Sequence, residues 1–122
     1  MKKTKLEEFI EKRINDELVW NVTDKSNVYS FTDRTDCITV CYAADYCNQK
    51  NATNTIFMIE RHEMVFDENW AENRELSTYE FIVISGNNKI AEINQYNVPK
   101  DLFFTFVQTA LKSQIENNED LL

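Results

Sequence analysis

Residues 78–96 read TYEFIVISGNNKIAEINQY, and they contain Gly86, the only glycine of the chain. Strand-forming side chains occupy both ends of this stretch, and polar residues around Gly86 separate them. Glycine and asparagine tolerate a positive φ, which tight turns between antiparallel strands require. The stretch therefore predicts a β-hairpin whose strands are residues 78–85 and 90–96.

The only proline, Pro99, follows this hairpin and marks the start of a helix. Proline suits the first turn of a helix, where its missing N–H would have no intrahelical partner. From there to about Asn117, apolar residues recur at the spacing of one helical face. They are Leu102, Phe103, Phe106, Val107, Ala110, Leu111 and Ile115. This stripe predicts an amphipathic helix that packs on a sheet or on another helix.

A second helix is predicted near the N-terminus, over residues 5–17. Thr4 and Glu7 have the spacing of a capping box, in which each side chain bonds a backbone N–H of the first turn. Apolar residues then follow at helical spacing, namely Leu6, Phe9, Ile10 and Ile14.

Between the two helices the apolar pattern changes to a period of two, which is typical of strands. The strand candidates are residues 18–22, 28–32, 37–44 and 55–66, the last with a bend or split near His62. Residues 46–54 are polar and predict a loop, with a short helix as the alternative. Short connections favour antiparallel neighbours. We therefore expect an α+β fold: an N-terminal helix, a meandering antiparallel sheet of about five to six strands, and a C-terminal helix packed on the sheet.

The length of 122 residues allows one hydrophobic core, so we expect one compact domain over residues 1–122 with frayed ends at 1–4 and 117–122. The basic N-terminal residues are not followed by the apolar region of a signal peptide, and no stretch is long and apolar enough for a membrane span. Three cysteines, an odd number, are typical of a reducing compartment. These features predict a cytoplasmic protein with no membrane partner.

The chain is acidic, with 21 acidic and 13 basic residues and a net charge of −8. Binding to a phosphate backbone or to anionic lipid needs clustered lysine and arginine, so direct contact with nucleic acid or membrane is not expected. A basic protein surface, in contrast, would be attracted, and its encounter with this chain would be accelerated. The alternative is that the charge only keeps a small protein soluble.

No catalytic residue, metal site or cofactor is predicted. On a strand, Cys37 and Cys41 would share a face but lie about 13 Å apart, too far to bind one zinc ion. We expect these two residues and Cys47 to be small core side chains. His62 is the only histidine, and a Cys–His nucleophile pair with one of the cysteines is arithmetically possible, but no spacing selects it. An exposed histidine among charged neighbours is the favoured interpretation.

The candidate binding site is an acidic segment that surrounds a tryptophan. Residues 67–75 are predicted to form a long loop before the hairpin. Aromatic residues are enriched at the energetic centres of interfaces, and carboxylates steer basic partners. The predicted partner-binding residues are Asp67, Glu68, Trp70, Glu72, Glu75 and Glu80. In the alternative interpretation, Trp70 folds back onto the core and the segment is only a solvated connection.

In composition, this short, acidic, asparagine-rich and glycine-poor chain resembles the small inhibitors that mobile elements encode, including some anti-CRISPR and DNA-mimic proteins. The resemblance rests on no motif. It implies a non-enzymatic protein that blocks a nucleic-acid-binding enzyme by placing carboxylates where phosphates would bind. Two alternatives are a toxin-neutralising immunity protein and an acidic secretion-type chaperone. A third, an enzyme or small-ligand binder, would require a deep pocket near His62 and Cys41.

Overall fold

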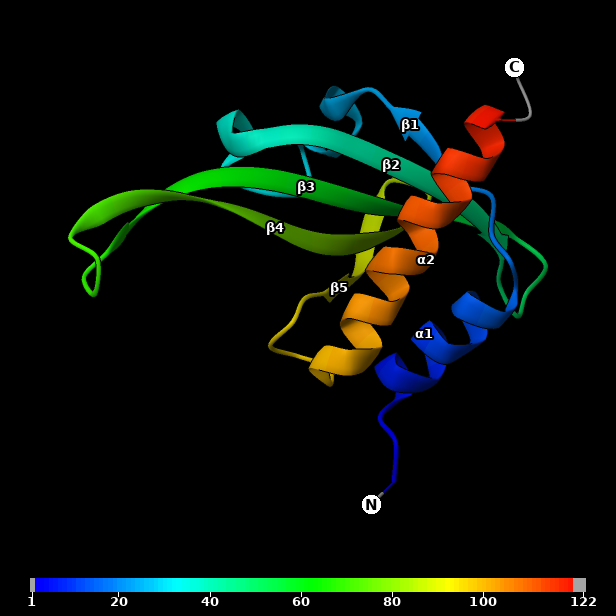
Figure 1. Ribbon diagram of the computed structural model, residues 1–122. Helices are drawn as coiled ribbons and strands as arrows, with labels where there is room; N and C mark the ends of the chain where they lie inside the picture. The colour runs from blue at the N-terminus through cyan, green and yellow to red at the C-terminus, as the bar shows by residue number, and fades with distance from the viewer. Residues whose placement is uncertain (1, 120–122) are drawn as a thin grey trace.

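The computed structural model describes residues 2–119 and confirms the predicted α+β fold (Figure 1). Within these residues, five antiparallel strands form one sheet in the order β1-β2-β3-β4-β5, so each strand pairs with its neighbours in the chain. The elements are α1 (Lys5–Asn15), β1 (Asn21–Thr23), η1 (Lys25–Val28), η2 (Thr35–Cys37), β2 (Ile38–Cys47), β3 (Thr53–Asp67), β4 (Glu72–Ser85), β5 (Asn88–Ile93) and α2 (Lys100–Glu119), where η marks a 3₁₀ helix.

The β4–β5 hairpin is confirmed, and Gly86 has the positive φ of 61° that its turn requires. The second strand is shorter than predicted, because it ends at Ile93 instead of residue 96. The side chain of Asn94 accepts the backbone N–H groups of Tyr96 and Asn97, at 2.8 and 3.1 Å, and so turns the chain out of the sheet. Asparagine commonly competes with a strand ladder in this way.

Both predicted helices are present. The Thr4 hydroxyl accepts the N–H of Glu7 at 3.1 Å, which confirms Thr4 as the N-cap of α1. Among the described residues, the Glu7 side chain does not form the reciprocal bond of a capping box. In α2, the N–H of Phe103 donates to the carbonyl of Pro99 at 3.0 Å, so the proline stands directly before the first helical residue. The helix continues to Glu119, so residues 117–119 are helical where fraying was predicted. The rest of that prediction, for Met1 and for residues 120–122, lies outside the described residues.

The two helices cover one face of the sheet and enclose the larger part of the core (Figure 1). Phe81 of β4 stacks on Phe106 of α2, with ring centroids 4.2 Å apart, and Trp20 meets both rings edge-on. Edge-to-face and offset aromatic pairs add to the stability that apolar burial supplies. This packing confirms that the C-terminal helix lies on the sheet.

The opposite face of the sheet is covered by residues 24–37, which contain both 3₁₀ helices (Figure 1). Here the predicted strand at 28–32 is wrong. The side chain of Asp24 accepts the N–H of Ser26 at 2.9 Å, which starts a 3₁₀ turn in place of an extended strand. The turn buries Val28 in a second apolar cluster with Ile38, Cys41, Ile59, Ile82 and Ile84.

The inner strands of the sheet, β2, β3 and β4, are longer than predicted. β2 continues to Cys47, so the predicted loop at 46–54 is reduced to a turn at 48–52. In that turn, Asn48 accepts the N–H groups of Lys50 and Ala52 at 2.9 and 3.1 Å. β3 runs for 15 residues without the predicted break at His62. The candidate site lies at the far end of this strand.

Candidate functional site

The outer parts of β3 and β4 form a two-stranded arm that extends beyond the rest of the sheet (Figure 1). Pairing between β2 and β3 ends at Ile38 with Arg61, and pairing between β4 and β5 ends at Phe81 with Ile93. The β3–β4 arm is therefore defined as residues 62–79. Within residues 2–119, neither helix covers it (Figure 1).

The arm corrects the prediction of a long loop at 67–75. β3 and β4 remain paired as far as Asp67 with Glu72, which leaves only a four-residue turn. In the turn, the N–H of Trp70 donates to the carbonyl of Asp67 at 3.3 Å, and Ala71 takes a left-handed φ of 49°. No glycine or proline marks this turn; its local signal is Asp67, whose side chain accepts the N–H of Asn69 at 3.0 Å.

Trp70 lies at the tip of the arm with 67% of its surface exposed, so the interpretation in which it folds back onto the core is wrong. The guanidinium of Arg74 lies 5.6 Å from the centre of its ring, a cation–π contact that orients the indole. Further large apolar side chains of the arm are exposed, which the sequence analysis did not predict. These are Met64, Val65, Phe66 and Leu76.

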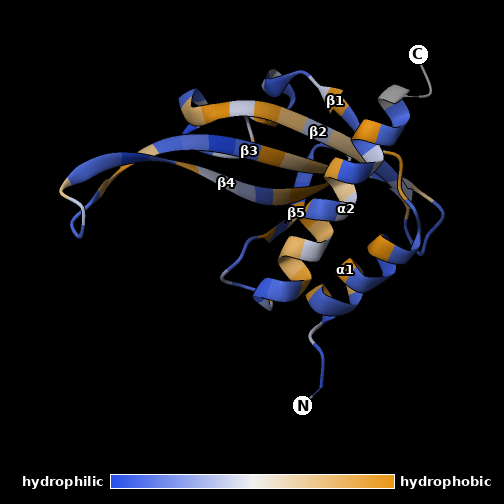
Figure 2. Ribbon diagram, in the orientation of Figure 1, coloured by the Kyte–Doolittle hydropathy of each residue, from blue (hydrophilic) through white to orange (hydrophobic). Residues whose placement is uncertain are grey.

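The exposed apolar residues stand among charged ones: residues 64–66 are consecutive between Glu63 and Asp67, and Leu76 follows Glu75. Short orange segments interrupt the mostly blue ribbon of the arm (Figure 2). Side chains on a strand point alternately to its two faces. Met64 and Phe66 therefore share the face that carries the helices farther along the sheet, while Val65 and Leu76 share the other face. Neither face of the arm is wholly polar, which is unusual for a segment surrounded by water.

Five of the six predicted site residues lie on the outer half of the arm: Asp67, Glu68, Trp70, Glu72 and Glu75. Their carboxylates are partly paired within the chain. Arg74 lies between Asp67 and Glu72, at 3.2 and 3.5 Å. Residues 63–76 nevertheless contain five carboxylates and one guanidinium, a net charge of −4. The arm is acidic after its internal ion pairs are counted.

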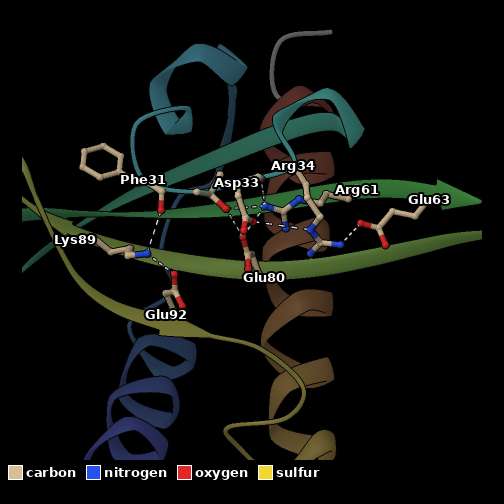
Figure 3. A network of polar contacts seen from close by, with 9 residues as sticks. Phe31, Asp33, Arg34, Arg61, Glu63, Glu80, Lys89 and Glu92 are labelled. Carbon is tan, nitrogen blue, oxygen red and sulfur yellow. Dashed lines mark hydrogen bonds and ion pairs between the residues drawn. The ribbon is translucent and has the colours of Figure 1, made fainter.

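Glu80, the sixth predicted site residue, stands apart from the other five. Its side chain is 20% exposed and pairs with Arg61 at 2.8 Å at the base of the arm (Figure 3). It also accepts the hydroxyl of Thr32 at 3.0 Å. This carboxylate therefore forms its contacts within the chain, with Arg61 and Thr32, and these contacts hold residues 24–37 on the sheet.

A network of cations holds that segment in place (Figure 3). The side chain of Arg61 is only 3% exposed and donates to the hydroxyl of Thr32 at 2.7 Å and to the carbonyl of Asp33 at 3.2 Å. On β5, which β4 separates from β3, Lys89 donates to the carbonyl of Phe31 at 3.0 Å. Buried polar groups cost free energy unless they are hydrogen-bonded, so these contacts determine how the segment sits.

His62 lies at the base of the arm among carboxylates, which confirms its predicted charged neighbours, and its side chain is partly exposed. Its Nδ1 is 2.8 Å from Glu75 and its Nε2 is 3.3 Å from Glu60. Hydrogen bonds to Glu75 and then to Glu60 raise the pKa of His62 above its usual value of 6.5. The imidazole thus links β3 to β4 where the arm leaves the body.

We expect the His62 ring to titrate above pH 6.5 when its chemical shifts are followed by NMR, and Glu75→Gln should lower that midpoint. Because the folded-state pKa is raised, the contribution of this group to stability is full below the unfolded pKa and is lost as pH rises through the folded pKa. Glu8→Gln, which removes a carboxylate on the first turn of α1, is the matched control. An unchanged midpoint in Glu75→Gln would contradict this assignment.

The structure also shows where the cysteines and His62 lie, which were considered above for nucleophilic catalysis and metal binding. Cys41 lies in the cluster under η1 and His62 on the opposite face of the sheet, so one pocket cannot contain both. Burial raises the pKa of the Cys41 thiol to about 12, so this thiol is protonated at neutral pH. Cys47 is exposed, contrary to the expectation that all three cysteines are core residues. Among residues 2–119, no group of three or more candidate ligands is placed to hold a metal ion.

Two shallow hollows lie on the helical side of the molecule, away from the arm. One, of about 510 Å³, is formed by the end of α1, the following link and the last turns of α2. The other, of about 190 Å³, lies between α1 and β5 and is mostly apolar. In the part of the chain that the structure describes, no helix is sufficiently long and apolar to span a bilayer.

Comparisons with protein-family models, with curated proteins and with solved structures found no match for this chain. Its candidate function therefore depends on its own geometry. The β3–β4 arm, with its exposed apolar residues and its negative charge, is the most distinctive surface in that geometry.

Proposed function

We propose that this chain is a non-enzymatic inhibitor that binds a basic protein surface through the β3–β4 arm. The observation that carries the proposal is the composition of the arm, in which exposed apolar side chains stand among carboxylates. Large apolar groups contribute to affinity when a partner removes them from water. Carboxylates around them accelerate the encounter with a basic partner and select against an acidic one.

The charge favours a different protein over a second copy of this chain as the partner. Two copies joined through their arms would bring two segments of net charge −4 together, within molecules of net charge −8. Such contacts between like charges are unfavourable unless basic residues intervene. Arg74 is the only arginine or lysine within residues 62–79.

The class of target that fits best is an enzyme that binds nucleic acid. Its groove carries lysine and arginine to neutralise phosphates, and these groups would attract the carboxylates of the arm. A two-stranded ribbon is also narrow enough to enter such a groove, since its strands lie about 4.8 Å apart. In this proposal Trp70, at the tip, reaches deepest into the target.

The experiment that tests this proposal compares two variants of equal charge. The arm variant carries Asp67→Asn, Glu68→Gln, Glu72→Gln and Glu75→Gln. The control carries Glu8→Gln, Glu17→Gln, Asp36→Asn and Glu116→Gln, which remove the same charge from the body. Each protein is immobilised and exposed to a panel of purified RNA-guided and restriction nucleases, and DNA cleavage is followed in parallel.

We expect the native chain and the body control to bind and inhibit the same nuclease. The arm variant should bind it at least about tenfold more weakly, because its steering charges and ion pairs are lost. If the two variants bind an identified target equally, the arm is not the contact surface.

A secretion-type chaperone is the second candidate, and the exposed apolar residues of the arm favour it. A chaperone of this kind holds its client on an apolar patch of several hundred Å² and usually dimerises. Sedimentation equilibrium separates the two functions, since the inhibitor proposed above is expected to be a monomer in the absence of its target. A dimer that persists in the arm variant would favour the chaperone.

A further inference from the structure

The outer edge of β4 is open along the arm. β5 pairs only with residues 81–85, so residues 72–80 have β3 on one side and no strand on the other. Among the described residues, no loop or cap forms a backbone hydrogen bond with this edge. The edge is long, and it contains no proline, glycine or bulge that would block pairing. Its charged side chains, among them Glu72 and Glu75, disfavour pairing with a strand of like charge.

The corresponding edge of β3 is less accessible. It is open only from residue 62 to 67, and the segment that enters β2 lies beside its inner end. Arg34 of that segment pairs with Glu63, which places a side chain across this edge. Between the two edges of the arm, β4 therefore offers the longer and less obstructed one.

A third strand would remove two weaknesses of the arm. A two-stranded ribbon is only marginally stable by itself in water, and three strands with an apolar face are more stable. The added strand would also satisfy outward backbone groups that now depend on water. In the same step it would bury part of Leu76, which is exposed in the centre of this edge.

The side chains along the edge indicate which strand would fit. Glu75, Ser77 and Tyr79 lie on the face that carries the helices, with a carboxylate at the outer end. Arg74, Leu76 and Thr78 lie on the other face, with an apolar side chain at the centre. Cross-strand neighbours interact most strongly when charges are opposite or when both are apolar. A complementary strand therefore places a basic residue beside Glu75 and an apolar residue beside Leu76.

We propose that the basic partner binds by strand addition, and that it contributes an extended segment of alternating basic and β-branched residues to the open edge of β4. This inference rests on the function proposed above and specifies how its contact forms. Main-chain hydrogen bonds supply affinity in such complexes, and the alternate side chains supply specificity. Net charge argues against a second copy of this chain as the source of the strand.

The test uses a capped seven-residue peptide that alternates lysine and valine, added at saturation to ¹⁵N-labelled protein. In an antiparallel ribbon, alternate residues point their N–H groups away from the partner strand. We expect every second amide between Asn73 and Tyr79 to exchange slowly with deuterium only when the peptide is present. A peptide with proline in place of the central valine should protect them much less, because proline has no N–H for the ladder and the peptide should therefore bind this edge more weakly.

A charge exchange checks the side-chain assignment. Glu75→Lys should weaken binding of the lysine peptide about fivefold, since like charges destabilise a cross-strand pair. The same variant should bind more tightly a second peptide in which glutamate replaces each lysine, since opposite charges stabilise the pair. Glu116→Lys, on the surface of α2, makes the same change in net charge outside the arm; it is the matched control and should alter neither affinity.

Uniform or absent protection of the edge amides at saturating peptide overturns strand addition. Suppose that the edge amides are not protected, but that the arm variant with four neutralised carboxylates binds the target more weakly than the native chain. The arm then remains the contact surface, and only the proposed mode of binding is wrong. If that variant also keeps its target, the proposed function fails as well.

Discussion

Arg61→Met should lower the free energy of unfolding by about 3 kcal/mol, because it leaves Glu80 without its cation in a half-buried site. The loss also removes the donor to the Thr32 hydroxyl and to the carbonyl of Asp33. Breaking a buried ion pair usually costs more than an exposed pair contributes. We expect the lower end of the usual range, since the Glu80 side chain retains 20% exposure and some contact with water.

Urea unfolding followed by circular dichroism measures this change, with equal slopes in both proteins as a check on two-state behaviour. Arg34→Met is the control, because Arg34 is exposed and its pair with Glu63 should contribute no more than about 1 kcal/mol. The double variant Arg61→Met with Glu80→Met should recover much of the loss, since an apolar pair leaves no buried charge. A loss below about 1 kcal/mol in the single variant would contradict the assigned role of this pair.

The most reliable predictions from sequence were those with a local physical cause. Gly86 marked a turn that only a residue tolerant of positive φ can form easily. Thr4 marked a helix start because its hydroxyl can accept an unpaired N–H of the first turn. Pro99 marked the other because proline has no N–H that would lack a partner there. Each of these signals depends on a few neighbouring residues, so it could be recognised without knowledge of the tertiary structure.

The errors arose where distant contacts decide the conformation. Residues 28–32 have the composition of a strand, but Val28 is buried as the last residue of a 3₁₀ turn. Arg61 and Lys89 then hold residues 31–33, which follow the turn, on the sheet. Those two cations lie about 30 and 60 positions farther along the chain. A local pattern contains no information on such partners, so propensity alone predicted the wrong element.

The candidate site was predicted only in part, because some of its residues are exposed as a result of how distant strands pair. The acidic residues and Trp70 were found because charge and aromatic character are visible in the sequence. Residues 55–66 predict a strand, but this pattern does not show that β2 ends before it reaches Met64, Val65 and Phe66. The signal that could have identified them is their position between Glu63 and Asp67, since a buried strand seldom places carboxylates at that spacing.

The arm therefore concentrates the features of an interface at a place where they contribute little to folding. The hydrogen-bond ladder between β3 and β4 is regular in the arm, but side chains on both faces of the arm are exposed to water. Substitutions at its tip should separate binding from stability more cleanly than substitutions at its base, where His62 and Arg61 join the arm to the body.

Trp70→Ala should reduce affinity for the target about 30-fold or more while changing the free energy of unfolding by no more than about 0.5 kcal/mol. The side chain is 67% exposed, so its removal leaves no cavity in the core. In a complex, a tryptophan at the centre of the contact typically contributes at least about 2 kcal/mol when a partner buries it, which corresponds to this loss of affinity. Calorimetric titration gives Kd, and urea unfolding gives the stability of the same preparation.

Tyr96→Ala is the matched control for this measurement. Tyr96 is another exposed aromatic residue, at 84%, but it lies in the turn between β5 and α2, outside the arm. Its removal should leave both Kd and stability unchanged, while Trp70→Phe should retain most of the affinity because it keeps an aromatic ring at the tip. Equal losses of affinity in Trp70→Ala and Tyr96→Ala would mean that exposed aromatic surface in general binds the partner. A loss confined to Trp70 would mean that the tip of the arm is the part of the molecule that the target encloses.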